Sequence, residues 1–136
     1  MNAHVGFITL GVGDLERAKR FYGEGLGWPV RVAQGHFVAF QAADGSSALT
    51  LYPRKVLADD AGVDPDGSGF RGLTFSHVVR SEERVDAVLT EAERAGGEVV
   101  RPAQRAGWGG YFGYFADSDG NLWKVVAGDG DQPYAE

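Results

Sequence analysis

The chain has 136 residues, 43% of them hydrophobic and 24% charged, which is the composition of one soluble globular domain. Its 13 Lys and Arg against 19 Asp and Glu give a net charge of −6, so it lacks the basic surface that nucleic acid or anionic lipid headgroups require. It has no cysteine, which excludes disulfides, thiolate metal sites and thiol nucleophiles. With no signal peptide and no long apolar run, we expect a cytoplasmic protein with no nucleic-acid or membrane partner.

The first part of the chain predicts a strand, a helix and three further strands. The apolar run at residues 5–12 indicates a buried strand. Asp14 is placed to cap the following helix, and the glycines from Gly23 onward end it. The next strands are predicted at residues 28–33, 36–41 and 48–52.

The second part of the chain repeats this order after a linker. Residues 53–71, rich in Asp, Gly and Pro, predict that linker, with one short helix near residues 56–61. A strand at 72–79 and a helix capped by Ser81 come next, and then strands at 98–102, 111–116 and 122–127, before a polar tail at 128–136. Because the offset is about 67 residues throughout, we interpret the chain as a single domain of two modules, 1–52 and 72–127.

Two segments carry a family resemblance. The first is Val12-Gly13-Asp14-Leu15-Glu16-Arg17-Ala18, followed by Phe21-Tyr22 and Leu26-Gly27-Trp28. The second is Gly113-Tyr114-Phe115-Ala116-Asp117-Ser118-Asp119-Gly120-Asn121-Leu122-Trp123, with Ser118 where the family usually has proline. Both resemble the vicinal oxygen chelate superfamily of glyoxalase I, bleomycin-resistance proteins, fosfomycin-resistance proteins and extradiol dioxygenases. The resemblance implies an α+β fold in which two βαβββ modules form one curved mixed sheet. That sheet is an open cup with helices on its outer face, often paired into a homodimer.

The resemblance also implies where a divalent metal is held in such a cup. The family's enzymes take His or Glu ligands from the first and fourth strand of each module. These positions fall here on Phe7, Thr50, Thr74 and Lys124. A phenyl ring, two hydroxyls and an ammonium do not hold a divalent ion, so we expect no metal and no cofactor.

The three histidines do not restore a ligand set. His4 and His77 each lie three residues from an expected cup position, so strand alternation places them on the opposite face. We expect His77 to be hydrogen-bonded on the side covered by the helix. His36 follows a turn, and the sequence assigns it no role.

Strand alternation predicts what the cup offers in place of a metal. The predicted floor has one ring, several hydroxyls and one cation, from Phe7, Thr9, Thr50, Thr74, Ser76 and Lys124. The predicted rim is the glycine-rich run 107–114, in which Trp108, Tyr111 and Tyr114 form a stacking wall for a ligand or serve as core or dimer-interface aromatics. Lys124 suits a ligand carboxylate, phosphate or carbonyl oxygen, although a one-residue shift of its strand turns it to solvent.

The sequence is consistent with three alternative functions. The first is a metal-free small-molecule binding protein of the bleomycin-resistance type, sequestering a drug or an aromatic metabolite. The second is a metal-independent enzyme, lyase-like or isomerase-like, that uses Lys124 in acid–base or Schiff-base chemistry. Metal-dependent glyoxalase or dioxygenase chemistry ranks last because its ligands are absent. The sequence does not identify the ligand.

Overall fold

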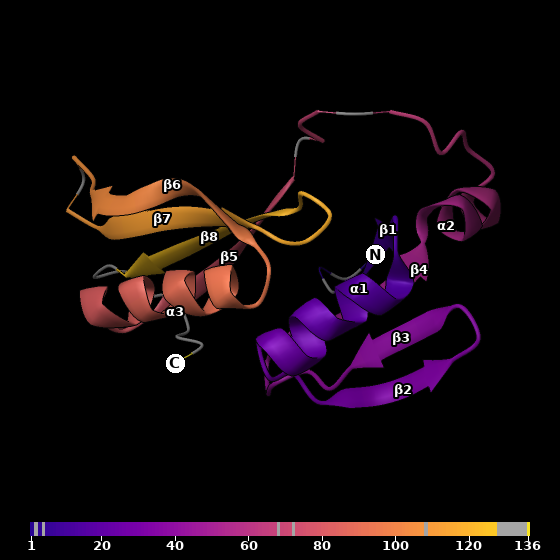
Figure 1. Ribbon diagram of the computed structural model, residues 1–136, viewed down its shortest axis with the longest axis horizontal. Coiled ribbons are helices and arrows are strands. Elements are labelled where there is room, and N and C mark those ends of the chain that lie inside the picture. The colour runs from indigo at the N-terminus through magenta and orange to yellow at the C-terminus, as the bar shows by residue number, and fades with distance from the viewer. Residues whose placement is uncertain (2, 4, 68, 72, 108, 128–135) are drawn as a thin grey trace. The chain divides into compact units, whose positions relative to one another are not determined.

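The computed structural model describes residues 1, 3, 5–67, 69–71, 73–107, 109–127 and 136. It divides into two units, Met1–Gly69 and Phe70–Glu136. Each unit contains the expected order of a strand, a helix and three strands (Figure 1), and the first unit has a further helix after them. This confirms the α+β class and the two modules. Hydrogen bonding groups the strands into two four-stranded sheets, where a single curved sheet was expected. Within the described ranges, no helix is both long enough and apolar enough to cross a lipid bilayer.

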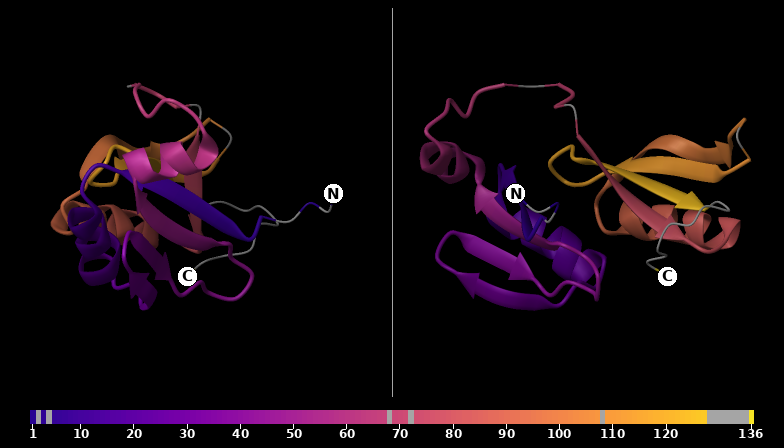
Figure 2. Two further views of the ribbon diagram at one scale, coloured as in Figure 1. Left: turned by 90° about the vertical axis from the view of Figure 1, so that its right-hand side faces the viewer. Right: turned by 180° about the vertical axis from the view of Figure 1, so that it is seen from behind.

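The first unit is built on a mixed sheet. Its elements are β1 (Phe7–Val12), α1 (Leu15–Arg20), the π-helical turn η1 (Phe21–Gly25), β2 (Val30–Gln34), β3 (Phe37–Phe40), β4 (Ala48–Pro53) and α2 (Arg54–Ala61). The strand order is β1-β4-β3-β2, with β1 parallel to β4 and the other pairs antiparallel (Figure 2). Asp14 caps α1 as predicted, because its side chain accepts a hydrogen bond from the Arg17 N–H at 3.0 Å.

An aromatic cluster fills the core of the first unit. Tyr22 is fully buried, and its ring centroid lies 5.1 Å from that of Trp28 and 5.8 Å from that of Phe40. The sequence predicted a strand starting at Trp28, but β2 begins at Val30. The Trp28 N–H donates to the Tyr22 carbonyl at 2.9 Å, so this residue closes the helical turn before the strand begins.

The predicted linker is partly helical. Helix α2 begins at Arg54 and packs against β1 at Gly11, where a Cβ atom would lie 3.2 Å from the Arg54 Cα and 3.3 Å from the Leu57 Cδ2. The helix ends at Gly62, whose φ of 75° is a left-handed conformation that favours glycine. A short helix in this segment was expected from the sequence, and the structure places its start closer to β4.

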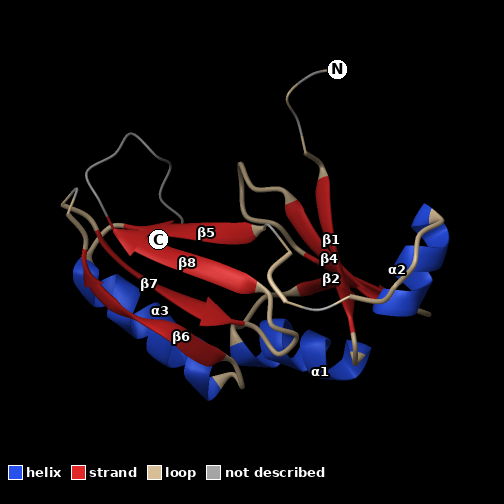
Figure 3. Ribbon diagram, turned by 90° about the horizontal axis from the view of Figure 1, so that it is seen from above, coloured by secondary structure: helices blue, strands red, loops and turns tan. Residues whose placement is uncertain are grey.

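The second unit repeats the arrangement. Its elements are β5 (Thr74–Val79), α3 (Glu82–Arg94), β6 (Glu98–Arg105), β7 (Tyr111–Ala116) and β8 (Leu122–Ala127), in the order β5-β8-β7-β6 with β5 parallel to β8. Ser81 caps α3 as predicted, accepting from the Arg84 N–H at 3.2 Å. Helix α3 covers one face of the sheet (Figure 3) and buries one apolar stripe against it, made of Val85, Val88, Leu89 and Ala92.

Strand β6 differs from its prediction. The sequence predicted its end at Pro102, but the strand continues to Arg105. Its register shifts between Val99 and Arg101 and again between Arg101 and Gln104. Proline has no N–H to give to a regular ladder, and these irregularities let the strand pass Pro102 and continue.

Candidate functional site

The sheet of the second unit has one face against α3 and one face turned away from it. Burial alternates along β8, with Trp123, Val125 and Ala127 buried and with Leu122, Lys124 and Val126 more exposed. The alternation predicted for this strand is therefore confirmed, and Lys124 lies on the face away from the helix. We call this surface the Lys124 face.

A row of polar side chains crosses the Lys124 face. Strand pairing aligns Arg101 of β6 with Tyr114 of β7, Tyr114 with Lys124 of β8, and Lys124 with Ser76 of β5. Paired residues in a sheet point to the same side, so the four side chains form one cross-strand row. Arg101 and Ser76 are exposed, as is Thr74 nearby on β5, whereas Tyr114 and Lys124 are half-buried.

Both cations of this row converge on one aromatic ring. The Lys124 Nζ lies 4.4 Å from the ring centroid of Phe112, and the Arg101 Cζ lies 4.9 Å from it. Phe112 is only 8% exposed, and the Tyr114 ring packs near it at 6.0 Å and 82°. The ring is thus a nearly buried platform that attracts two positive charges through its π electrons.

The expected site residues of the first unit lie on β1 and β4. Thr9 and Thr50 are paired in the parallel ladder, and their hydroxyl oxygens are 2.7 Å apart. Thr50 is 2% exposed, so this hydrogen bond satisfies a buried hydroxyl. Phe7 begins β1 and is 60% exposed.

The two described residues of the expected rim, Tyr111 and Tyr114, lie on opposite faces of the sheet. The Tyr111 hydroxyl donates to Asp86 of α3 at 2.7 Å, so this side chain is turned to the helix side, opposite Tyr114. That hydrogen bond is the main cause that raises the pKa of Tyr111 above its usual value. Trp108 lies outside the described residues.

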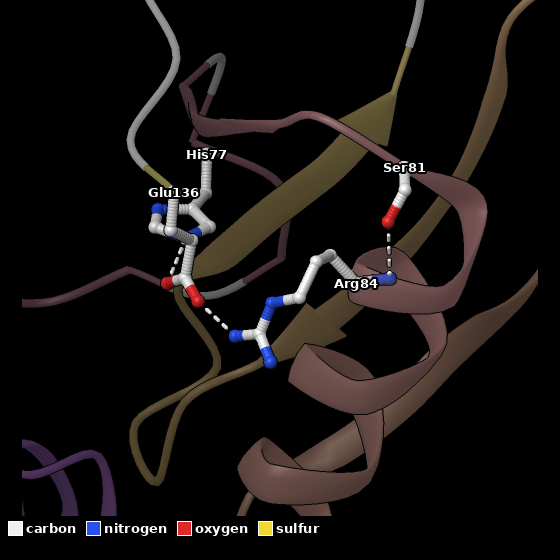
Figure 4. A network of polar contacts seen from close by, with 4 residues as sticks. All are labelled: His77, Ser81, Arg84 and Glu136. Atoms are coloured by element: carbon white, nitrogen blue, oxygen red, sulfur yellow. Dashed lines mark hydrogen bonds and ion pairs between the residues drawn. The ribbon is translucent and has the colours of Figure 1, made fainter.

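His77 takes part in a polar network (Figure 4). Its Nε2 lies 3.0 Å from one carboxylate oxygen of Glu136, and the other oxygen pairs with Arg84. Burial is the main cause that lowers the pKa of His77 below 6.5; the Arg84 guanidinium adds to this shift and Glu91 opposes it. The expectation of a hydrogen-bonded His77 is confirmed, His36 is exposed, and His4 lies outside the described residues.

The lowered pKa of His77 predicts that the protein is less stable in mild acid. The unfolded chain binds a proton at His77 at a higher pH than the folded chain does, so the free energy of unfolding falls as the pH drops below about 6.5. We expect the urea midpoint to fall between about pH 7.5 and about pH 5.5, and to fall less in His77→Gln. The exposed His36→Gln is the matched control and should behave as wild type. An equal fall in His77→Gln and wild type would contradict the prediction.

Two βαβββ modules, each with a mixed four-stranded sheet and a helix between its first two strands, define the structural class of the chain. The family model of the glyoxalase/bleomycin resistance protein/dioxygenase superfamily matches residues 4–125. The chain belongs to this superfamily, which confirms the resemblance seen in the sequence.

Solved structures agree with this assignment. A glyoxalase-related enzyme from Fulvimarina pelagi is 35% identical, with a TM-score of 0.84 over 93% of this chain and 89% of that one. A hypothetical protein from S. aureus is 25% identical, with a TM-score of 0.79 over 94% and 95% of the two chains. A lactoylglutathione lyase from Agrobacterium tumefaciens is 24% identical, with a TM-score of 0.69 over 94% and 96%, and shares the fold. No curated protein matches the chain significantly.

The residues at the positions where the resemblance implies metal ligands do not fit a divalent ion. Phe7 offers no donor atom, Thr50 is hydrogen-bonded to Thr9, Thr74 offers a neutral hydroxyl, and the Lys124 ammonium lies over an aromatic ring. Over the described part of the chain, no three His, Cys, Asp or Glu side chains come together in a group that could hold a metal.

Sequence reasoning missed two residues of the Lys124 face, Phe112 and Arg101. Phe112 has the same strand parity as Tyr114, which was a signal that it shares the face. Arg101 had no such signal, because the register irregularities on both sides of it break the alternation in β6.

Proposed function

We propose that this protein binds a small molecule without a metal ion. The observation that carries the proposal is the set of side chains at the family's metal positions, Phe7, Thr50, Thr74 and Lys124, which supplies no carboxylate and no imidazole. Recognition then depends on hydroxyls, aromatic rings and the cations of the Lys124 face. The ligand class that we favour is a drug or an aromatic metabolite, sequestered rather than converted.

The proposal includes the setting in which binding takes place. We place the protein in the cytoplasm as a homodimer, in which the two modules act as one domain joined by residues 53–71. The family resemblance supports the dimer, since relatives often pair in this way. Light scattering of the purified protein tests it, because a monomer at micromolar concentration contradicts it.

A metal-independent enzyme is the second candidate. It is favoured by the 35% identical structure, which is described as a glyoxalase-related enzyme, and by the alignment of Lys124 with the hydroxyls of Ser76 and Tyr114. Borohydride reduction in the presence of a panel of carbonyl compounds tests the Schiff-base form of this candidate. A covalent adduct at Lys124 supports the enzyme, and turnover of none of these compounds, with retained binding and no adduct, supports the binding protein.

Ligand binding is expected to be independent of metal. We expect the purified protein to carry less than one equivalent of zinc, nickel, manganese or iron. In a thermal-shift screen of antibiotics and aromatic metabolites, at least one compound should raise the melting temperature equally with and without EDTA. A ligand at about 100 times its Kd adds about 2.7 kcal/mol to the free energy of unfolding, which such a screen detects.

A variant supplies the control for this experiment. Lys124→Glu restores one carboxylate and should gain no metal affinity, since one ligand does not form a site. Stoichiometric metal in wild type, lost on chelation together with ligand binding, would overturn the proposed function.

A further inference from the structure

We propose that the row formed by Arg101, Tyr114, Lys124 and Ser76 is an oxyanion-binding site, which takes the carboxylate or phosphate group of a small molecule. This inference rests on the proposed binding function and names the class of its ligand. Three observations support it: the side chains of the row are hydrogen-bond donors, its two cations lie beside the Phe112 ring, and its ends are exposed to solvent.

Every side chain of the row is able to donate a hydrogen bond. The guanidinium of Arg101 and the ammonium of Lys124 carry only donors, and the hydroxyls of Tyr114 and Ser76 each provide one O–H. The row contains no carboxylate. The strand register places Glu98, the acidic residue of β6, in the next row, opposite Ala116. An oxyanion carries only acceptors, so it is the complement of this row.

The two cations lie beside the same aromatic ring although their strands are not adjacent. Arg101 and Lys124 lie on strands with β7 between them, so their Cα atoms are about 10 Å apart at the usual strand spacing. Their side chains nevertheless lie within 5 Å of the same Phe112 ring centroid. The π electrons of Phe112 attract both cations, which keeps two positive charges beside one ring on this face of the sheet. An anion bound next to this ring is attracted by both charges.

The row also has the right accessibility for a ligand. Arg101 and Ser76, at its two ends, are exposed, while Tyr114 and Lys124 in the middle are half-buried. Partial burial strengthens a charge-assisted hydrogen bond relative to one at a fully solvated surface. The planar guanidinium binds two oxygens side by side, and the lysine adds a point charge. This concentration of positive charge stands on a chain whose net charge is −6.

Three matched probes test the site on the intact protein. Benzoate and phenyl phosphate each join an oxyanion to a ring, and benzamide is the neutral counterpart of benzoate. In a ¹H–¹⁵N titration, we expect the two anions to shift the backbone amide signals around Ser76, Arg101, Tyr114 and Lys124, and benzamide to leave these signals unchanged. The tighter of the two anions identifies the carboxylate or the phosphate as the preferred group. Added salt should weaken binding by screening.

Charge-removing variants test the two cations separately. Lys124→Met keeps an unbranched side chain over Phe112, and Arg101→Gln changes an exposed residue, so both should fold. Each is expected to weaken anion binding about tenfold or more, because a charge-assisted hydrogen bond is lost. Lys55→Met removes the same charge from an exposed position on α2 and should leave the affinity unchanged.

The outcomes separate this inference from the proposed function. Equal binding of benzamide and benzoate, wild-type affinity in both variants, or no response to either anion overturns the oxyanion site. If uncharged compounds still stabilise the protein in the thermal-shift screen, the proposed function stands without the oxyanion site. A stoichiometric metal overturns the proposed function even if anions bind to the row.

Discussion

Replacing Asp117 by alanine is expected to lower the free energy of unfolding by about 3 kcal/mol, because a buried carboxylate with three donors is lost. Asp117 is 5% exposed and lies in the turn between β7 and β8. One of its carboxylate oxygens accepts from the N–H groups of Asp119 and Asn121, both at 2.9 Å, and the other accepts from the Asn121 Nδ2 at 2.8 Å. Without these contacts, the turn loses three of the hydrogen bonds that fix its shape.

The midpoint of guanidinium unfolding measures this effect. Asp117→Asn keeps one acceptor oxygen and should fall between alanine and wild type. Asp44→Ala changes an exposed aspartate in a turn of the first unit and should alter the free energy of unfolding by less than about 0.5 kcal/mol. If Asp117→Ala were as stable as Asp44→Ala, the carboxylate would have no structural role in the turn.

The second large effect is expected at Gly113 in β7. A Cβ atom there would lie 2.7 Å from the Leu89 Cδ1, 2.9 Å from the Arg101 carbonyl oxygen and 3.0 Å from the Ala103 nitrogen. Leu89 can rotate, but the other two atoms are backbone and move only if β6 moves. We therefore expect Gly113→Val to cost about 3 kcal/mol of stability through overpacking. Because β6 carries Arg101, the variant should also bind anions more weakly at the Lys124 face.

A second glycine provides the control. Gly107 is exposed and its φ lies outside the left-handed region. Its chain neighbours aside, no heavy atom of the described residues lies within 4 Å of the Cβ position. Gly107→Val should therefore be close to wild type in both stability and anion binding. Denaturant unfolding followed by circular dichroism compares the two variants. If Gly113→Val had wild-type stability, β6 would be able to move away from the valine without a loss of free energy, and the prediction would be wrong.

Local signals account for most of what the sequence predicted of the fold. Asp14 and Ser81 are recognisable caps because a side-chain oxygen before an apolar helical stripe satisfies the first free N–H groups. The strands at 111–116 and 122–127 were found with their observed bounds, since turn residues separate them. Trp28 was misplaced because its role depends on contacts with Tyr22 and Phe40, which a local pattern does not contain.

The site was less predictable because it depends on register. The alternation in β8 placed Lys124 correctly, as the strand is regular over its whole length. Tyr111 and Tyr114 were grouped as neighbours in sequence, although an odd spacing separates them onto opposite faces. Arg101 depends on two irregularities beside Pro102, and no single-sequence signal marks where a bulge re-aims a side chain.

The parallel pairing of β5 with β8 has a consequence for how the second unit forms. Thr74 opens this unit's first strand, and its partner Leu122 opens the last, so the ladder joins segments from nearly opposite ends of the unit. Closing such a long loop costs chain entropy, and the hairpins β6-β7 and β7-β8 close far shorter ones. During synthesis, β5 therefore leaves the ribosome first and has no strand to pair with until β8 has been translated. Until then, the edge of β5 that β8 will cover is open to pairing with other chains.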